Sequence, residues 1–166
     1  VALLYNKNEF QVLESKSIPV LIYEKNKIRD YTRDILYVKG ILNNSVVHVY
    51  VNHWPSKRNG YDETRAKRIE IAKLLHADMS LIEEEDPNII ILGDFNDNPN
   101  DDSVKNHLAI NNITNPTSDL FNKGLGTSKF YGSWMLFDQI LISKNLENSG
   151  SLEFKKVKIF DDEFLK

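Results

Sequence analysis

Runs of apolar and alternating residues open the chain, and such patterns predict β-strands. Residues 1–5 are almost entirely apolar and predict a buried strand at the very start. A second extended segment covers residues 10–23, after a polar turn at Asn6-Lys7-Asn8-Glu9. Two strands are therefore expected before residue 24.

A β-hairpin is the clearest prediction in the N-terminal half. Residues 34–42 and 45–52 form two apolar-rich runs around Asn43-Asn44, and asparagine tolerates the positive φ of a tight hairpin turn. Both faces of the second run are largely apolar, which indicates a strand inside a sheet that is covered on both sides. Its two faces carry Val47, Val49 and Val51 on one side, and Val46, His48 and Tyr50 on the other. His48 is expected to be structural.

The hydrophobic period changes between residues 62 and 85, where it predicts an amphipathic helix. Asp62 is placed to cap its start, and Asp86-Pro87 ends it, because the residue before a proline disfavours the helical conformation. A short apolar strand, residues 89–92, then stops at Gly93-Asp94. The apolar stripe of the helix consists of Ala66, Ile69, Ala72, Leu75, Met79 and Ile82.

The rest of the chain mixes shorter elements. We expect a short helix near residues 103–109, surface loops over 111–132, a strand over 137–143 and a last strand over 154–160. Hairpins mixed with helices favour an α/β (α+β) sandwich over a parallel doubly wound sheet. Because no repeat or linker divides the sequence, residues 1–166 are expected to form a single domain.

Composition narrows the possible chemistry. The chain is 41% hydrophobic and 27% charged, and its net charge of −3 gives no broad basic field for unspecific binding of nucleic acid. It has no cysteine, which excludes disulfides, zinc–thiolate sites and cysteine nucleophiles. Its longest apolar run is far shorter than the roughly 20 residues of a membrane span. We expect a soluble monomer, either cytoplasmic or exported, since any signal peptide would lie upstream of Val1.

Gly93-Asp94-Phe95-Asn96 is the first segment that can carry chemistry. Alternation after the rigid apolar strand places Asp94 and Asn96 on the same side. A carboxylate there can hold a metal ion or orient a water molecule, and an amide can donate to a phosphate oxygen. Taken alone, the segment also fits a plain strand-ending turn. An EF-hand loop is disfavoured, because Pro99 and Lys105 replace the required glycine and glutamate.

Two further segments carry candidate residues. Asn52-His53-Trp54-Pro55-Ser56 ends the hairpin's second strand, where His53 either donates to a phosphate oxygen or is a core-edge histidine bonded to backbone. Asp138 lies one step into an apolar run, where an unpaired charge is costly. Its partner is therefore a histidine that it orients or an arginine in a structural bridge. A basic stretch either attracts an anionic substrate or forms a solvated helix face: Lys57, Arg58, Arg65, Lys67 and Arg68.

In this order, the segments resemble the endonuclease/exonuclease/phosphatase superfamily, which includes pancreatic-type deoxyribonucleases, abasic-site endonucleases, bacterial sphingomyelinases and inositol-polyphosphate phosphatases. The stretch from Asn52 to Ser56 resembles its strand-end histidine segment, and Gly93-Asp94-Phe95-Asn96 resembles its Gly-Asp-Phe-Asn signature. Asp138-Gln139-Ile140 resembles its late Asp-x-Ile strand. The resemblance covers residues 1 to about 143 and is strongest to a bacterial branch with Asn-His-Trp-Pro-Ser before Gly-Asp-Phe-Asn-Asp.

The resemblance implies a four-layer sandwich, in which two mainly antiparallel β-sheets pack face to face with helices outside. It implies a Mg²⁺- or Mn²⁺-dependent hydrolase in which water attacks phosphorus in line. Asp94 would orient or deprotonate that water and touch the metal with Asn96, which would also bond the phosphate. His53, beside Asn52, would bind the substrate and donate to a non-bridging oxygen. Asp138 would hold a catalytic histidine in the correct tautomer.

Two parts of the family's site do not occur in this sequence. The early Gln-Glu segment, which supplies the metal-binding glutamate, and the late Ser-Asp-His segment are both missing. We therefore expect residues 1–166 to be the central part of such a domain, without its two ends, and to be inactive alone. A non-catalytic binding or structural module is the alternative. The substrate stays open among nucleic acid, a phospholipid head group and a small phosphodiester.

Overall fold

The expected hairpin forms and lies at the centre of the fold. In the computed structural model, which describes residues 1–23, 28–148 and 151–161, Asn43 and Asn44 have φ angles of 47° and 62°. They join β4 (Ile35–Leu42) to β5 (Ser45–His53), which pair antiparallel. A two-residue turn with both φ angles positive matches the natural twist of the strands that it connects.

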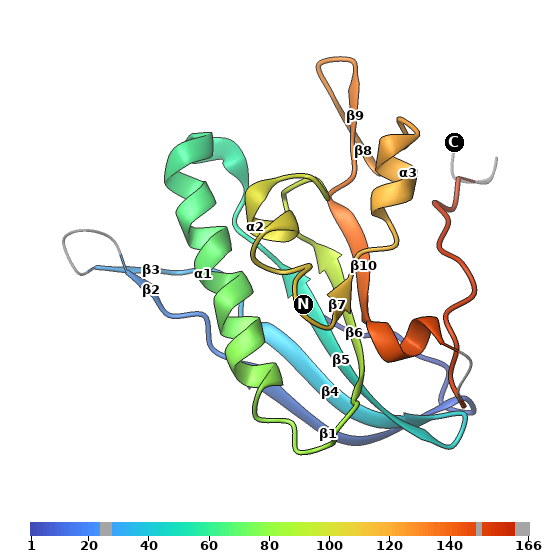
Figure 1. Cartoon of the computed structure of the whole chain (residues 1–166). Helices are drawn as coiled ribbons and strands as arrows, with labels where there is room; N and C mark the ends of the chain where they lie inside the picture. The colour runs from blue at the N-terminus through green and yellow to red at the C-terminus, as the bar shows by residue number, and fades with distance from the viewer. Residues whose placement is uncertain (24–27, 149–150, 162–166) are drawn as a thin grey trace.

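Six strands form one mixed sheet in the order β1-β4-β5-β6-β10-β7 (Figure 1). Neighbouring strands are antiparallel except β5 and β6, which are parallel because a helical crossover connects them. The other strands of this sheet are β1 (Phe10–Ile18), β6 (Asn88–Asp94), β7 (Ile113–Thr114) and β10 (Asp138–Ser143).

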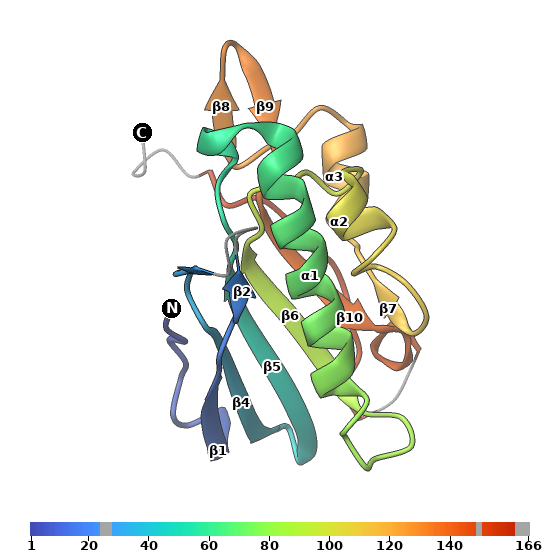
Figure 2. The same cartoon turned by 90° about the vertical axis from the view of Figure 1, so that its left-hand side faces the viewer.

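Helices cover one face of this sheet, with α1 and α2 over the strands and α3 beside them near one end (Figure 2). The helices are α1 (Tyr61–Met79), α2 (Asp102–Lys105) and α3 (Ser118–Asn122), with 3₁₀ turns η1 (Lys57–Asn59) and η2 (Lys144–Glu147). Two small hairpins complete the fold: β2 (Ile22–Tyr23) with β3 (Arg29–Asp30), and β8 (Ser128–Phe130) with β9 (Ser133–Met135).

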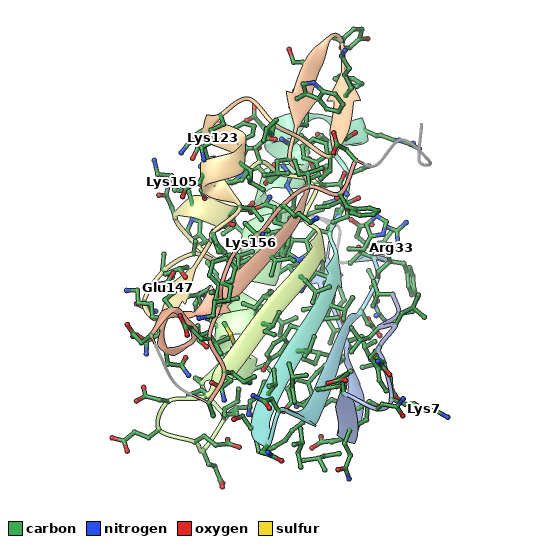
Figure 3. The ribbon with its side chains drawn as sticks, turned by 90° about the vertical axis from the view of Figure 1, so that its right-hand side faces the viewer. Lys7, Arg33, Lys105, Lys123, Glu147 and Lys156 are labelled. Atoms are coloured by element: carbon green, nitrogen blue, oxygen red, sulfur yellow. The ribbon has the colours of Figure 1, made fainter. Side chains whose placement is uncertain are left out.

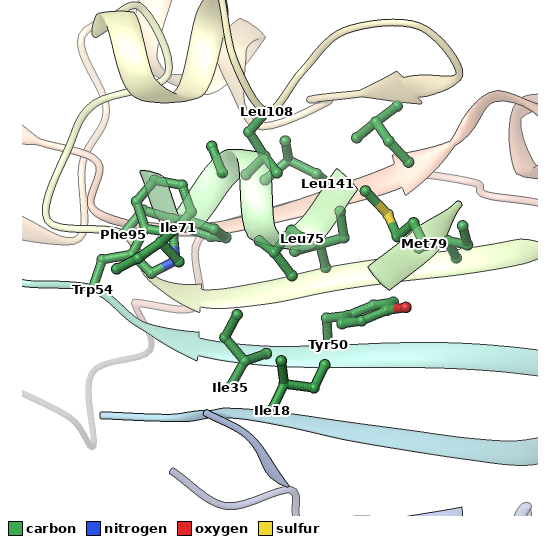
Figure 4. Close-up of a cluster of buried hydrophobic side chains, with 14 of the residues drawn as sticks. Ile18, Ile35, Tyr50, Trp54, Ile71, Leu75, Met79, Phe95, Leu108 and Leu141 are labelled. Atoms are coloured by element: carbon green, nitrogen blue, oxygen red, sulfur yellow. The ribbon is translucent and has the colours of Figure 1, made fainter. Parts of the chain in front are cut away.

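The main hydrophobic core lies between α1 and the sheet (Figure 4). Ile71 and Leu75 of α1 pack with Tyr50 of β5 and Ile91 of β6, and each is at most 1% exposed. A second cluster covers the opposite face and includes Phe10, Val38, Val47, Val49 and Val51. The chain segment that contains Lys156 runs across this second face (Figure 3). Side chains on both faces of β5 are buried, as its apolar pattern predicts.

The crossover helix differs from its prediction at both ends. It begins after Gly60, without a side-chain cap, and Asp62 lies in its first turn. It ends at Met79, well before Glu85, because the negative end of the helix dipole disfavours the run of four carboxylates that follows. Ala72, Leu75 and Met79 are buried as expected, but Ala66 is exposed.

Some expected strands do not form. Residues 1–5 and 154–160 are not in any strand, and Leu4 is 96% exposed, because neither segment pairs with a sheet edge. The region 111–132, expected as loops, contains β7, α3 and β8. The mixed α/β class is confirmed. Within the described ranges, one large sheet and one helical layer form, and no helix is long and apolar enough to cross a membrane.

Candidate active site

Three candidate residues lie in one row across three neighbouring strands, about 4.8 Å apart from strand to strand. β5 and β6 run parallel, and the Cα positions of His53 and Asp94 are paired where both strands end. β10 runs in the opposite direction, and its first residue, Asp138, is paired with Asp94. Register thus brings residues that are far apart in the sequence onto one edge of the sheet. We refer to His53, Asp94 and Asp138 as the strand-end row.

The strand-end row belongs to the sheet face that points away from α1. Val51 of β5 and Leu92 of β6 pack in the cluster on that face. Side chains two residues apart on a strand share a face, so His53 and Asp94 follow them onto it. Figure 3 views the molecule from this side.

His53 and Asp94 approach each other within the row. Nε2 of His53 lies 3.6 Å from Oδ2 of Asp94, and the two side chains are 38% and 32% exposed. Oδ1 of Asp94 accepts the backbone N–H of Asn96 at 2.8 Å. One carboxylate oxygen is thus fixed while the other faces the imidazole. This arrangement can accept a proton from water, donate to an anion through His53 or contribute an oxygen ligand to a cation.

Asn96 connects the loops that follow β5 and β6. Its φ of 51° lies in the left-handed region, which asparagine adopts more readily than most residues. Its amide donates to the carbonyl of Trp54 at 2.9 Å, while the Trp54 N–H donates to the carbonyl of Asp94 at 2.8 Å. The Trp54 indole and the Phe95 ring are both buried and pack edge to face at 4.9 Å. These contacts hold the backbone around Asp94 in one position.

Gly93 is required by a close approach between β5 and β6. Its φ is 135°, and a Cβ at this position would lie 2.0 Å from the carbonyl oxygen of Asn52. Only glycine satisfies both the angle and the space. The glycine of the Gly-Asp-Phe-Asn segment therefore lets Asp94 sit directly beside the end of β5.

Asn52 lies on the other face of β5, away from the strand-end row. It is 2% exposed, its amide donates to the carbonyl of Tyr50 at 3.1 Å, and its Oδ1 accepts the Trp54 indole N–H at 3.0 Å. These contacts favour a structural role over the substrate contact that we expected, because burial keeps the amide from a ligand.

Asp138 is exposed, whereas we expected a buried carboxylate that requires a partner. Its backbone N–H donates to Thr127 at 3.3 Å, and its carboxylate forms no ion pair within the part of the chain that the structure describes. The start of β10 is open to solvent, so water can solvate the carboxylate and a buried partner is not required. Asp138 lies in the row, but the histidine or arginine partner is not found among the described residues.

A buried ion pair between Arg68 and Asp97 lies next to the row and was not predicted from the sequence. Asp97 is 1% exposed, and its Oδ2 accepts Arg68 Nε at 2.6 Å and Ser103 Oγ at 2.5 Å. Lys57 Nζ lies 2.9 Å from its Oδ1, and Gln139 donates to its backbone carbonyl at 2.6 Å. The cluster fastens the loop after Asp94 to α1, η1 and β10. Arg68 lies four residues before Ala72 and seven before Leu75, which is the spacing of the buried face of α1. This spacing is the sequence signal that could have predicted its burial.

A sequence model of the Endonuclease/Exonuclease/phosphatase family matches residues 1–166 of the chain. The chain belongs to this family. No curated protein that was compared matches it.

Solved structures of other proteins share the family's fold with this chain. A D. rerio TDP2 humanized by 14 mutations aligns with a TM-score of 0.62 at 17% identity, over 82% of this chain and 53% of that one. D. rerio TDP2 complexed with a single-strand DNA product gives 0.59 at 17% identity, over 82% and 54%. The human Nocturnin catalytic domain with bound sulfate gives 0.57 at 20% identity, over 83% and 50%. The chain spans about half the length of these structures.

The described residues provide only part of a ligand set for a divalent metal ion, which members of this family generally require. No group of three or more histidine, aspartate and glutamate side chains that could hold a metal ion occurs among residues 1–23, 28–148 and 151–161. The directly paired Asp94 and Asp138 nevertheless suit a cation, because like charges on paired positions repel unless something positive lies between them. The described residues offer oxygen ligands but not a complete set.

Most cations of the basic stretch form ion pairs within the fold, whereas Arg58 is exposed. Burial lowers the pKa of Lys57, but hydrogen bonds to Asp101 and Asp97 outweigh it and raise the pKa overall. Burial raises the pKa of Asp101, yet Lys57 and the Asn98 N–H lower it overall. Arg65 and Lys67 also pair with carboxylates, of Asp102 and Asp30. The paired carboxylates offset the positive charge of Lys57, Arg65 and Lys67, so these residues attract an anionic substrate only weakly. Arg68 is buried rather than solvated.

Proposed function

We propose that the chain carries part of the active site of a metal-dependent hydrolase that cleaves phosphoester bonds, phosphodiesters in particular. The strand-end row is the observation that supports this most strongly, because it gathers an imidazole and two carboxylates at one exposed edge. Membership of the endonuclease/exonuclease/phosphatase family supports the reaction class. The assignment to a bacterial branch stays a prediction.

The roles follow from the contacts of each side chain. Asp94 keeps Oδ2 available to orient or deprotonate the attacking water, while His53 donates to a non-bridging oxygen as its negative charge grows. Asn96 fixes the Asp94 carboxylate through its N–H and lies next to the phosphate site. Asp138 would orient a catalytic histidine, for which the described residues offer no candidate. Mg²⁺ or Mn²⁺ held by Asp94, with Asn96 beside it, would neutralise charge on the phosphoryl oxygens.

The substrate class proposed is nucleic acid. TDP2 of D. rerio, a structural relative, has been solved with a single-strand DNA product, which supports this class over a phospholipid head group. The expectation that residues 1–166 are the central part of one such domain, inactive alone, also stays a prediction.

A non-catalytic module of the same fold is the second candidate. It is favoured by one observation, namely that the described residues hold no complete metal site. In that case Asp94 and Asn96 would serve only the turn that ends β6.

Hydrolysis of bis-p-nitrophenyl phosphate by the complete gene product, with Mg²⁺ or Mn²⁺, separates the two candidates. Asp94→Ala is expected to lower kcat about 10²- to 10⁴-fold, as for loss of a general base. Asp86→Ala, which removes an exposed carboxylate near the other end of β6, is the matched control and should leave kcat unchanged. The 166-residue chain alone should show little turnover. The proposed function is wrong if the complete product is inactive with both Mg²⁺ and Mn²⁺, or if Asp94→Ala does not lower kcat.

A further inference from the structure

The β8–β9 hairpin carries three large aromatic side chains that are exposed to solvent. Phe130, Tyr131 and Trp134 are 61%, 94% and 50% exposed. The hairpin extends beyond the end of the large sheet in both views (Figures 1 and 2). Trp134 is paired with Lys129, and Phe130 with Ser133, so Trp134 and Phe130 lie on opposite faces of the hairpin. Large apolar side chains that stay exposed on a projecting hairpin often serve binding.

The fold does not need an aromatic residue at the tip of this hairpin. Tyr131 and Gly132 have φ angles of 46° and 83°, so both central residues of the turn are left-handed. Asparagine or glycine adopts this conformation more readily than a bulky residue does. Burial cannot explain Tyr131 either, since it is the most exposed of the three rings. Its ring packs edge to face on Phe130 at 4.4 Å, and neither of these two rings lines the groove beside Trp134.

Trp134 lines a groove that continues to the strand-end row. The groove has a volume of about 560 Å³, and its lining includes Trp134, Asp138, Gly93, Lys158 and Phe160. Met135 ends β9, and Asp138 begins β10 three residues later, so the hairpin is fastened directly beside the row. A group bound against Trp134 would thus lie next to a phosphate bound at the strand-end row.

Lysine side chains lie over two aromatic rings that line this groove. Lys129 Nζ lies 5.4 Å from the centre of the Trp134 ring, and Lys158 Nζ lies 5.6 Å from that of Phe160. Rings that stack on flat bases, with lysines that meet the phosphate backbone, are the combination that binds single-stranded nucleic acid. Much of the groove wall is apolar, with Leu136, Ile140 and Ile159 among its residues, but the carboxylate of Asp138 at its edge disfavours a lipid chain there.

We propose that this groove is a stacking subsite for an unpaired nucleobase that adjoins the scissile phosphate of a single-stranded nucleic acid, with Trp134 as its principal ring. The inference rests on the proposed function for the neighbouring phosphate site, which it deepens by naming how the substrate is recognised. The volume of the groove lies within the range of small-molecule sites and admits a nucleotide.

Tryptophan fluorescence tests the subsite directly. The chain has two tryptophans, of which Trp54 is 1% exposed and Trp134 is 50% exposed. Titration with a short oligothymidylate in EDTA, which prevents metal-dependent cleavage, is expected to quench the Trp134 emission in a saturable way. Trp134→Leu should remove this quenching and weaken binding of a labelled oligothymidylate roughly 5- to 150-fold, as loss of one stacked base does.

Two variants control the experiment. Trp134→Phe keeps a ring and should retain most of the affinity for the labelled oligothymidylate. Tyr23→Leu removes a ring of similar exposure (58%) on β2, outside the groove, and should bind as the unaltered chain does. Circular dichroism of each variant checks that it is folded.

Three results would overturn the subsite: no saturable quenching, equal affinity after Trp134→Leu, or quenching by phosphatidylcholine vesicles but not by oligothymidylate. The last result would indicate a membrane surface as the partner. Because the assay contains no metal and measures no hydrolysis, it can succeed even if the proposed function fails. Hydrolysis of bis-p-nitrophenyl phosphate without oligothymidylate binding would reject the subsite alone.

Discussion

Arg68 provides the most specific test of how the candidate site is held in place. Arg68→Met removes the guanidinium while keeping an apolar stem of similar length, so the change is mainly one of charge. Arg68 and Asp97 are 0% and 1% exposed, and removing one partner of a buried pair costs about 3–5 kcal/mol. Lys57 and Ser103 still contact the Asp97 carboxylate, which favours the lower end, about 3 kcal/mol. For a chain of this size, that corresponds to a fall in Tm of about 6–12 °C.

Urea unfolding followed by circular dichroism measures the change in free energy of unfolding. Arg65→Met is the matched control, because Arg65 lies three residues earlier on α1 and forms a similar contact to Asp102 at 2.7 Å, but is 44% exposed. An exposed ion pair contributes at most about 1 kcal/mol. Equal losses for the two variants, or a loss below about 1 kcal/mol for Arg68→Met, would refute the buried-pair account.

Two further predictions concern the strands on either side of the site. Burial lowers the pKa of His48 below 6.5, so the unfolded chain takes up this proton at a higher pH than the folded chain. The free energy of unfolding should therefore decrease as the pH falls below about 6.5, and His48→Gln should flatten that decrease in urea titrations between about pH 7.5 and 5.5. Gly93→Ala should cost at least about 3 kcal/mol in the same assay, whereas Gly124→Ala, which has a positive φ but open space, should cost about 1–2 kcal/mol. An equal cost for the two glycines would show that the contact with Asn52 does not matter.

Local patterns predicted the parts of the fold that depend on neighbours in sequence. Asn43-Asn44 identified the hairpin because a two-residue turn requires positive φ. The apolar run before Gly93 identified β6 and its end at Asp94. The same reasoning failed at residues 1–5, since an apolar run becomes a strand only where a sheet edge is available to pair with it.

The candidate site depends on tertiary register, which the sequence did not reveal by itself. That His53, Asp94 and Asp138 share one row follows from how three strands pair, not from their spacing along the chain. Arg68 appeared to be a solvated cation because its partner, Asp97, lies on a distant loop. Asp138 appeared to be buried because the residues after it are apolar, yet the start of β10 is open to solvent.

The central claim is that metal-dependent chemistry takes place at the strand-end row, and binding of Mn²⁺ to the chain tests it most directly. Paramagnetic Mn²⁺ broadens the NMR signals of nearby amides. We expect the amides of His53, Asp94 and Asp138 to broaden first in a titration, and Asp94→Asn to remove that effect. The acidic residues 83–86 are an internal comparison, because they offer carboxylates without the row's geometry. Broadening that begins at residues 83–86 and leaves the row unaffected would contradict the claim.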